Sequence, residues 1–185
     1  MKELDFINLN EDLTLIYGPG ASGKTTIAML SAVEYLDKNK KVVFVDTENG
    51  FSVDRFSQIC GPNYLYYLDK LLLIKVNNFK EQSERIDTLI NLVQVDLIIV
   101  DSLGAYYRKD VRENPTEVNK KMDRQLKILT ELSRRNMSVL VTNQVSTNPE
   151  TGEVNMVGGE MVKKWAKKLI ELKREPRRIV LKRPE

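Results

Sequence analysis

The sequence predicts an α/β fold, in which helices cover both faces of a mainly parallel central sheet that ends in a C-terminal β-hairpin. The first observation is that short apolar runs alternate with longer amphipathic stretches along most of the chain, which is typical of such a sheet. The second is the run at 96–101, Asp-Leu-Ile-Ile-Val-Asp, whose continuous apolar centre is expected of a strand buried on both faces. The third is a pair of β-prone runs on either side of Glu175-Pro176, which predicts the hairpin.

The first half of the chain is expected to supply three strands and three helices. The strands are short β-prone or apolar runs, and the helices are longer stretches with apolar residues on one face. In the third helix that face consists of Ile86, Leu89, Ile90 and Val93. The expected strands lie at 13–17, 41–46 and 71–76, and the expected helices lie at about 24–38, 52–60 and 78–93.

The second half adds the central strand, one long helix, a further buried strand and the hairpin. Met122, Leu126, Leu129 and Leu132 recur at helical spacing and predict the long helix. No Gly/Ser/Pro linker divides the chain, so we expect residues 1–185 to form a single domain. The expected strands lie at 96–101, 138–142, 168–172 and 178–181, and the expected helix lies at about 116–135.

The composition excludes several kinds of chemistry. The chain has no histidine and one cysteine, Cys60, which excludes imidazole catalysis, histidine-liganded metals and an internal disulfide. No apolar run approaches the ~18 residues of a membrane helix, and the first residues do not resemble a secretion signal, so we expect a cytoplasmic protein outside membranes. The net charge is +3, but residues 161–185 carry ten Lys or Arg and three Glu. This basic end indicates either a polyanionic partner or a solvated face.

A glycine-rich loop after the first strand gives the most specific indication of function. Residues 18–25 fit the pattern G-x-x-x-x-G-K-[ST], in which backbone N–H groups and the start of a helix bind a polyphosphate. We expect Lys24 to reach the β- and γ-phosphates, Thr25 to ligate Mg²⁺, and Thr26 to donate to an α-phosphate oxygen. The residues expected to bind the nucleotide here are Gly18, Pro19, Gly20, Ala21, Ser22, Gly23, Lys24, Thr25 and Thr26.

Three polar residues end other strands of the predicted sheet, at the edge where ligands of parallel α/β sheets bind. Asp101 stands where the second Mg²⁺-holding residue of P-loop enzymes is found. Glu48 can orient or deprotonate the attacking water, or it can simply cap the turn before Ser52. Gln144 can sense the γ-phosphate, or it can be an ordinary polar strand end. The guanine-reading Asn-Lys-x-Asp signature is absent, which argues against a Ras-type GTPase.

Together these motifs resemble the ATPase core of the RecA/RadA recombinase family, from about residue 12 to the end. The chain is most similar to the short archaeal paralogues of RadA. This resemblance implies a RecA-like P-loop NTPase fold, binding of ATP and Mg²⁺, slow DNA-dependent ATP hydrolysis, and an accessory role beside a RadA-type recombinase in recombination and repair. The matching segments are 18–26, 45–51, 99–102, 141–145 and 158–159.

The resemblance also implies roles for individual residues. Glu48 would be the catalytic carboxylate, Arg55 would pack on the adenine, and Gln144 would couple the γ-phosphate to the following loop. The expected catalytic residues are therefore Glu48, Lys24 and Gln144, and Arg55 is expected to bind the nucleotide. Two loops, at 103–116 and 145–158, would face DNA, preferably single-stranded. The first loop interleaves aromatic and basic residues, which suits base stacking and phosphate contact, although its tyrosines could instead pack over the sheet edge. These residues are Tyr106, Tyr107, Arg108, Lys109 and Arg112.

Some features depart from the recombinase pattern. The Gly-rich lead-in and linker phenylalanine of RadA-type proteins have no counterpart in the residues before the first expected strand, and Asn49 replaces a common glycine. The loop at 145–158 has Glu150 and Glu153 but no Lys or Arg. A KaiC-like regulator, in which ATP gates a protein partner without DNA binding, is therefore an alternative. A small-molecule kinase is a third, although Arg108–Arg112 is the only candidate for its lid.

Overall fold

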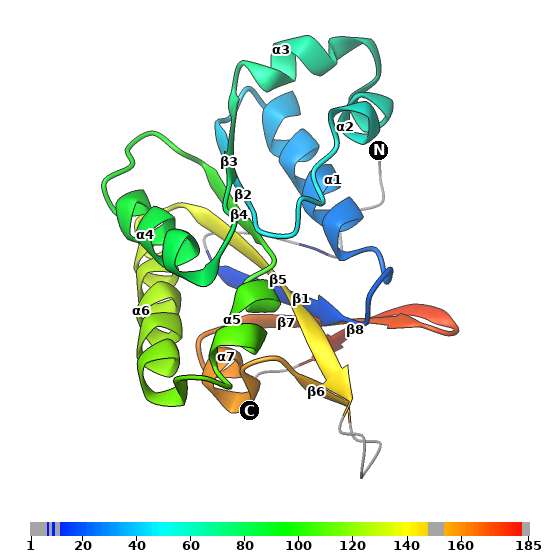
Figure 1. Ribbon diagram of the computed structural model, residues 1–185. Helices are drawn as coiled ribbons and strands as arrows, with labels where there is room; N and C mark the ends of the chain where they lie inside the picture. The colour runs from blue at the N-terminus through cyan, green and yellow to red at the C-terminus, as the bar shows by residue number, and fades with distance from the viewer. Residues whose placement is uncertain (1–6, 8, 10–11, 148–153, 183–185) are drawn as a thin grey trace.

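The computed structural model describes residues 7, 9, 12–147 and 154–182. Within these ranges the chain forms an eight-stranded sheet with helices on both faces (Figure 1). The strands are β1 Leu13–Gly18, β2 Val42–Asp46, β3 Leu71–Lys75, β4 Leu97–Asp101, β5 Ser138–Thr147, β6 Val154–Met156, β7 Lys168–Arg174 and β8 Arg177–Lys182. The helices are α1 Lys24–Asp37, α2 Val53–Cys60, α3 Tyr64–Leu68, α4 Phe79–Leu89, α5 Gly104–Asp110, α6 Pro115–Ser133 and α7 Gly159–Lys163, with a 3-10 turn at Gly61–Asn63.

The sheet has the strand order β3-β2-β4-β5-β1-β7-β8, and β6 pairs with the far end of β5. Every neighbouring pair from β3 to β7 is parallel, whereas β8 and β6 are antiparallel to their partners. Parallel neighbours need crossover connections, and helices supply several of them. The predicted mainly parallel sheet with a C-terminal hairpin is confirmed.

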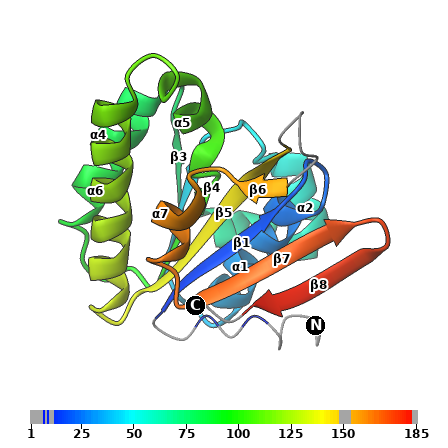
Figure 2. The same ribbon diagram turned by 90° about the horizontal axis from the view of Figure 1, so that it is seen from below.

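Helices cover both faces of the sheet, as Figures 1 and 2 show. Alternate residues of β2 enter different cores because successive side chains of a strand point to opposite faces. Val43 and Val45 pack in the core beneath α4, α5, α6 and α7, whereas Val42 and Phe44 pack in the core beneath α1, α2 and α3. The strands are therefore buried on both sides, which explains why they read as continuous apolar runs in the sequence.

Capping residues set where three of the helices begin. Ser52, Asn78 and Asn114 each accept a hydrogen bond from the backbone N–H three residues later, at the starts of α2, α4 and α6. The predicted end of α4 is wrong: the helix stops at Leu89, and Val93, expected on its apolar face, is 78% exposed. Apolar spacing alone could not distinguish the last helical turn from the turn that follows it.

The carboxyl ends of β1, β2, β4 and β5 meet at one edge of the sheet. Pairing places Asp46 beside Asp101 and Gly18 beside Gln144. Because β7 runs parallel to β1, the tip of the β7–β8 hairpin reaches the same edge. Segments far apart in the sequence therefore converge on the loop that follows β1.

Candidate nucleotide-binding site

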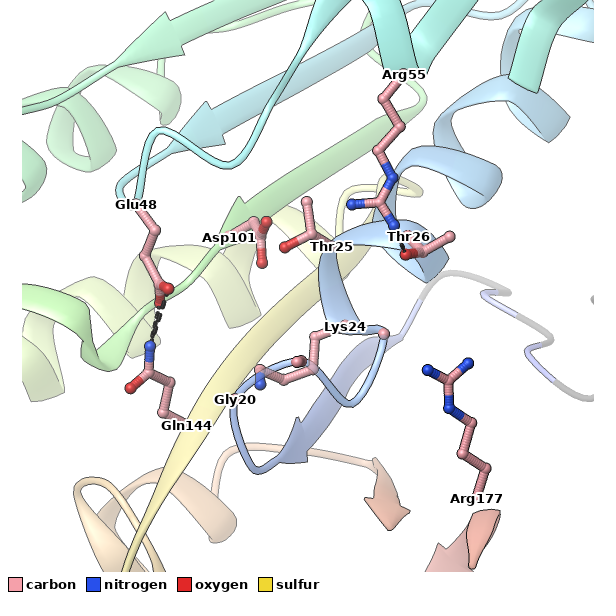
Figure 3. A pocket seen from close by; sticks show the side chains of 11 residues that line it. Gly20, Lys24, Thr25, Thr26, Glu48, Arg55, Asp101, Gln144 and Arg177 are labelled. Atoms are coloured by element: carbon pink, nitrogen blue, oxygen red, sulfur yellow. Dashed lines mark hydrogen bonds between the residues drawn. The ribbon is translucent and has the colours of Figure 1, made fainter. Parts of the chain in front are cut away.

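A cavity of about 340 Å³ lies at this edge of the sheet. Eleven residues line it, drawn from the β1–α1 loop, α1, the β2–α2 connection, α2, the end of β4, β5 and β8 (Figure 3). Gln144 does not end its strand as expected, because β5 continues to Thr147. Ten of the eleven are residues that the sequence singled out for nucleotide, metal or catalytic roles, and the eleventh is Arg177. The structure thus brings the side chains of four predicted strand ends into one site.

The glycine loop is shaped for close approach of a ligand to the backbone. A Cβ on Gly18 would lie 2.4 Å from the carbonyl oxygen of Leu172, so no other residue fits between β1 and β7. Gly23 has φ +100°, a conformation that favours glycine, and it is the N-cap residue just before α1. No side chain caps this helix start among the described residues, so the N–H groups there point freely at the loop. Such a helix end attracts phosphate.

Lys24 spans the inside of the loop. Its Nζ donates hydrogen bonds to the carbonyl oxygens of Gly18 at 2.9 Å and Pro19 at 2.8 Å. Burial lowers the pKa of Lys24, while the nearby carboxylates of Glu48 and Asp101 act in the opposite direction. A phosphate bound in the loop would, like these two carboxylates, favour the charged form of Lys24. This is expected of a lysine that binds phosphate.

Asp101 and Thr25 form the part of the cavity suited to a magnesium ion. The Oδ1 atom of Asp101 accepts a hydrogen bond from Thr142 Oγ1, whereas its Oδ2 atom is buried without a partner among the described residues. Burial raises the pKa of Asp101, and the hydroxyls of Thr142 and Thr25 oppose that shift. An orphaned carboxylate oxygen beside a threonine hydroxyl fits Mg²⁺, which binds through one or two protein oxygens plus phosphates. No cluster of three or more acidic or cysteine side chains occurs in the described ranges, and this metal needs none.

Glu48 stands on a turn that Asp46 holds in place. The two carboxylate oxygens of Asp46 accept hydrogen bonds from the backbone N–H groups of Glu48, Gly50 and Phe51 at 3.0–3.3 Å. Asn49 lies between them with φ 53°, which asparagine tolerates better than most residues. The substitution of asparagine for the common glycine therefore leaves the turn intact. Within this turn Glu48 does not cap α2, which Ser52 does.

The carboxylate of Glu48 is joined directly to Gln144. Gln144 Nε2 lies 2.8 and 2.9 Å from the two oxygens of Glu48 (Figure 3). Ser102 Oγ donates to the same carboxylate. The end of β4, β5 and the β2–α2 turn are therefore connected through one acid. Sequence reasoning expected both residues at this edge but did not expect them to bind each other.

Arg55 and Arg177 lie at the opposite end of the cavity from Glu48 (Figure 3). Arg55, from the first turn of α2, donates a hydrogen bond to the hydroxyl of Thr26. Arg177 starts β8 and comes from the hairpin that reaches this edge. The sequence did not identify Arg177 as a site residue, and its only related signal was the excess of basic residues after 161. The approach of Arg177 to the loop depends on the parallel pairing of β7 with β1, which the sequence pattern does not specify.

The segment 103–116 is not an open loop. It contains α5, and Tyr107 is buried against Phe79 while its hydroxyl donates to Asn119 Oδ1 at 2.7 Å. Tyr106 is half-buried and donates to the carbonyl oxygen of Val76 at 3.0 Å. The expectation that these tyrosines stack on bases is therefore corrected: they pack over the sheet, the other possibility that the sequence allowed. Arg108, Lys109 and Arg112 remain exposed.

The second expected DNA-facing segment, 145–158, is in part a hairpin. β5 continues through its first residues and pairs antiparallel with β6, with Val145 opposite Met156. Glu150 and Glu153, which bear on its charge, lie outside the described residues. Asn143 anchors the base of the hairpin by donating to the carbonyl oxygen of Val157 at 2.8 Å. The hairpin therefore begins directly after Gln144.

The strand order, the glycine loop and the Thr25–Asp101 pair beside it define the class of this protein as a P-loop fold of the RecA type. The model of the RecA N-terminal domain family matches residues 10–179. The chain belongs to the RecA family, and within it to the RadB group of DNA repair and recombination proteins. Proteins of the RecA family are ATPases.

Individual relatives support this assignment. The DNA repair and recombination protein RadB of Methanococcus maripaludis strain C7 is 32% identical over 166 residues, covering 88% of this chain and 76% of that protein. RadB of Methanothermobacter thermautotrophicus is 34% identical over 170 residues, covering 86% and 72%. A crystal structure of the RadB recombinase superposes with a TM-score of 0.78 at 33% identity, covering 95% of this chain and 82% of that one. In the described part of the chain, no helix is long and apolar enough to span a membrane.

Proposed function

We propose that this protein is a Mg²⁺-dependent ATPase that binds DNA and assists homologous recombination and repair beside a RadA-type recombinase. One observation carries the proposal: the glycine loop, Lys24, the Thr25–Asp101 pair and Glu48 line a single cavity. Membership of a family of recombination proteins supports the biological role. Single-stranded DNA is the proposed nucleic acid.

In the proposed reaction, the loop and the start of α1 bind the phosphates, and Lys24 exchanges its two carbonyl partners for phosphate oxygens. Thr25 and Asp101 would hold Mg²⁺, which would supply positive charge to offset the negative charge of the phosphates. Glu48 orients the attacking water and accepts its proton. The reaction class is therefore hydrolysis by in-line attack of water on the γ-phosphate.

Gln144 controls when Glu48 can act. In the structure its amide nitrogen is within hydrogen-bond distance of both oxygens of the Glu48 carboxylate. A γ-phosphate oxygen is a competing acceptor for this amide, so bound ATP would draw Gln144 away and free the carboxylate for water. Because the β5–β6 hairpin begins directly after Gln144, the same movement would reach that hairpin.

The proposed DNA contacts come from α5 and the turn after it. Arg108, Lys109 and Arg112 are exposed, and none of them forms an ion pair with a carboxylate in the described part of the chain. Exposed cations on one helix and the turn after it suit the backbone of a nucleic acid. With both tyrosines packed, binding would depend on phosphate contacts and would be strongly sensitive to salt.

The burial of Tyr107 also favours a second candidate, a KaiC-like regulator in which ATP gates a protein partner without DNA. The motifs of the nucleotide site are the same in both cases, so only binding can separate them. In that case the hairpin after Gln144 would contact a protein, and exposed residues of α5 would have no nucleic-acid role.

ATP hydrolysis measured alone, with single-stranded DNA, and with DNA plus a cognate RadA-type recombinase tests the proposal. We expect slow basal hydrolysis that requires Mg²⁺ and rises with DNA. Fluorescence anisotropy with labelled single-stranded DNA at low salt separates the two candidates. DNA binding supports the recombination role, and its absence with and without ATP, together with ATP-dependent capture of a purified protein partner, supports the regulator.

A further inference from the structure

Among the described residues, the outer end of the cavity has no aromatic side chain with which to bind a nucleobase. None of the eleven lining residues is aromatic. The two acidic lining residues, Glu48 and Asp101, lie at the inner end, near Lys24 and Thr25 (Figure 3). The planar groups at the outer end are the guanidinium groups of Arg55 and Arg177.

These two arginines reach the cavity from separate elements. Arg55 extends from α2 and donates a hydrogen bond to Thr26, the residue after Thr25, which we propose to bind Mg²⁺. Arg177 rises from the tip of the β7–β8 hairpin, and its guanidinium points toward the same space from the other side (Figure 3). The glycine loop and Lys24 account for the phosphates further in. The part of a nucleotide left between the arginines is therefore the nucleoside.

The position of the hairpin is fixed by the sheet. β7 pairs with β1 over four residues from Thr14 to Tyr17, and it packs so tightly on the start of the loop that a Cβ on Gly18 would meet Leu172. β8 is held to β7 in register, with Arg174 opposite Arg177. The side chain of Arg177 makes no hydrogen bond or ion pair with another residue that the structure describes, so its guanidinium is available to a ligand.

We propose that Arg177 binds the nucleobase by stacking on the face opposite Arg55, so that the base lies between two guanidinium planes. This inference rests on the proposed function and adds a specificity-determining residue to it. Guanidinium groups stack on aromatic faces, which all nucleobases possess. Within the part of the chain that the structure describes, the outer end contributes no side-chain amide or carboxylate to read base edges. The clamp therefore holds purine nucleotides without distinguishing ATP from GTP strongly.

The test is calorimetric titration with ATP, GTP and inorganic tripolyphosphate in the presence of Mg²⁺. For Arg177→Ala we expect ATP and GTP affinity to fall by about three- to tenfold, the range for an exposed cation–base contact. Tripolyphosphate affinity stays unchanged, because it has no base. Arg177→Lys loses ATP affinity like Arg177→Ala, because an ammonium keeps the charge but has no plane to stack.

Arg178→Ala is the matched control, since Arg178 is the next residue of β8, is exposed and does not line the cavity. We expect it to bind all three ligands like the wild type. Equal losses of ATP and tripolyphosphate in Arg177→Ala, full recovery in Arg177→Lys, or no loss at all would each overturn the stacking role while leaving the proposed ATPase intact. A wild-type protein that binds no ATP would overturn both proposals.

Discussion

The inner and outer ends of the cavity are built in different ways. At the inner end the side chains are buried or hydrogen-bonded to one another: Lys24 is 8% exposed, Asp101 is 2% exposed, and Glu48 contacts Ser102 and Gln144. At the outer end Arg55 and Arg177 are both exposed, and they come from elements on different sides of the loop. The inner end is preorganised for charge, whereas the outer end is open, and in our proposal a bound nucleobase completes it.

This difference suggests a division of labour. Fixed dipoles and charges at the inner end are the arrangement that stabilises charge as it develops in a reaction. Contacts at the outer end concern only the non-reacting part of a nucleotide, so their loss should affect affinity much more than the chemical step. Substitutions at the two ends can therefore be compared directly, from the largest expected effect to the smallest.

Glu48→Gln should have the largest effect. We expect kcat for ATP hydrolysis to fall by roughly 10²- to 10⁴-fold, the range for losing a positioned base, while ATP affinity changes little. The glutamine side chain still accepts from Ser102, so the turn should keep its shape. Steady-state phosphate release and ATP titration measure the two quantities. Glu160→Gln, an exposed residue of α7 paired with Lys163, is the control. Wild-type hydrolysis in Glu48→Gln would remove Glu48 from the catalytic role.

Lys24→Ala should come next, and its effect should be on binding. We expect ATP affinity to fall by roughly 10²- to 10³-fold, because a buried charge that faces the phosphates is lost. The carbonyl groups of Gly18 and Pro19 would then also point at the phosphates without a donor between them. Titration with ATP measures the change, and Lys38→Ala, at the exposed far end of the same helix, provides the comparison. A loss of less than tenfold would contradict the assigned role.

The sequence predicted the inner end residue by residue because local patterns define it. The glycine loop and Asp101 each lie in a strand–loop segment whose geometry is set by its own few residues. Contacts between segments distant in the chain were not predictable in this way. The Glu48–Gln144 pair spans 96 residues, and the approach of Arg177 depends on which strand β7 joins. The packing of Tyr107 depends on α4 in the same manner.

The exposed cations of α5 should have a moderate effect that is confined to DNA. For Arg108→Ala/Lys109→Ala we expect affinity for single-stranded DNA to fall roughly tenfold at low salt, and the slope of log K against log salt to decrease by about 1.4. ATP affinity should not change, because neither residue lines the cavity. Anisotropy over a salt series measures both. The control is Lys40→Ala/Lys41→Ala, which removes the same charge just before β2, at the other edge of the sheet. Equal losses in both double variants would show that net charge alone matters.

Asp101→Asn should have the smallest effect, which is a small increase in the melting temperature of the ligand-free protein. Burial raises the pKa of Asp101 above its value in the unfolded chain, so the ionised carboxylate destabilises the ligand-free fold at pH 8. That destabilisation disappears as the pH falls through the folded-state pKa, because the group is then neutral.

Asparagine keeps an oxygen for the hydrogen bond from Thr142 and removes the charge. Without Mg²⁺ and nucleotide, we expect Asp101→Asn to melt above the wild type at pH 8, by about 2–4 °C for each 1 kcal/mol gained, with the difference shrinking at acid pH. With Mg²⁺ and ATP present, the order should reverse, because the variant loses its metal ligand. Asp69→Asn, on an exposed turn, should show neither effect. A lower melting temperature for ligand-free Asp101→Asn at pH 8 would contradict this prediction. It would mean that the ionised carboxylate of Asp101 stabilises the ligand-free fold.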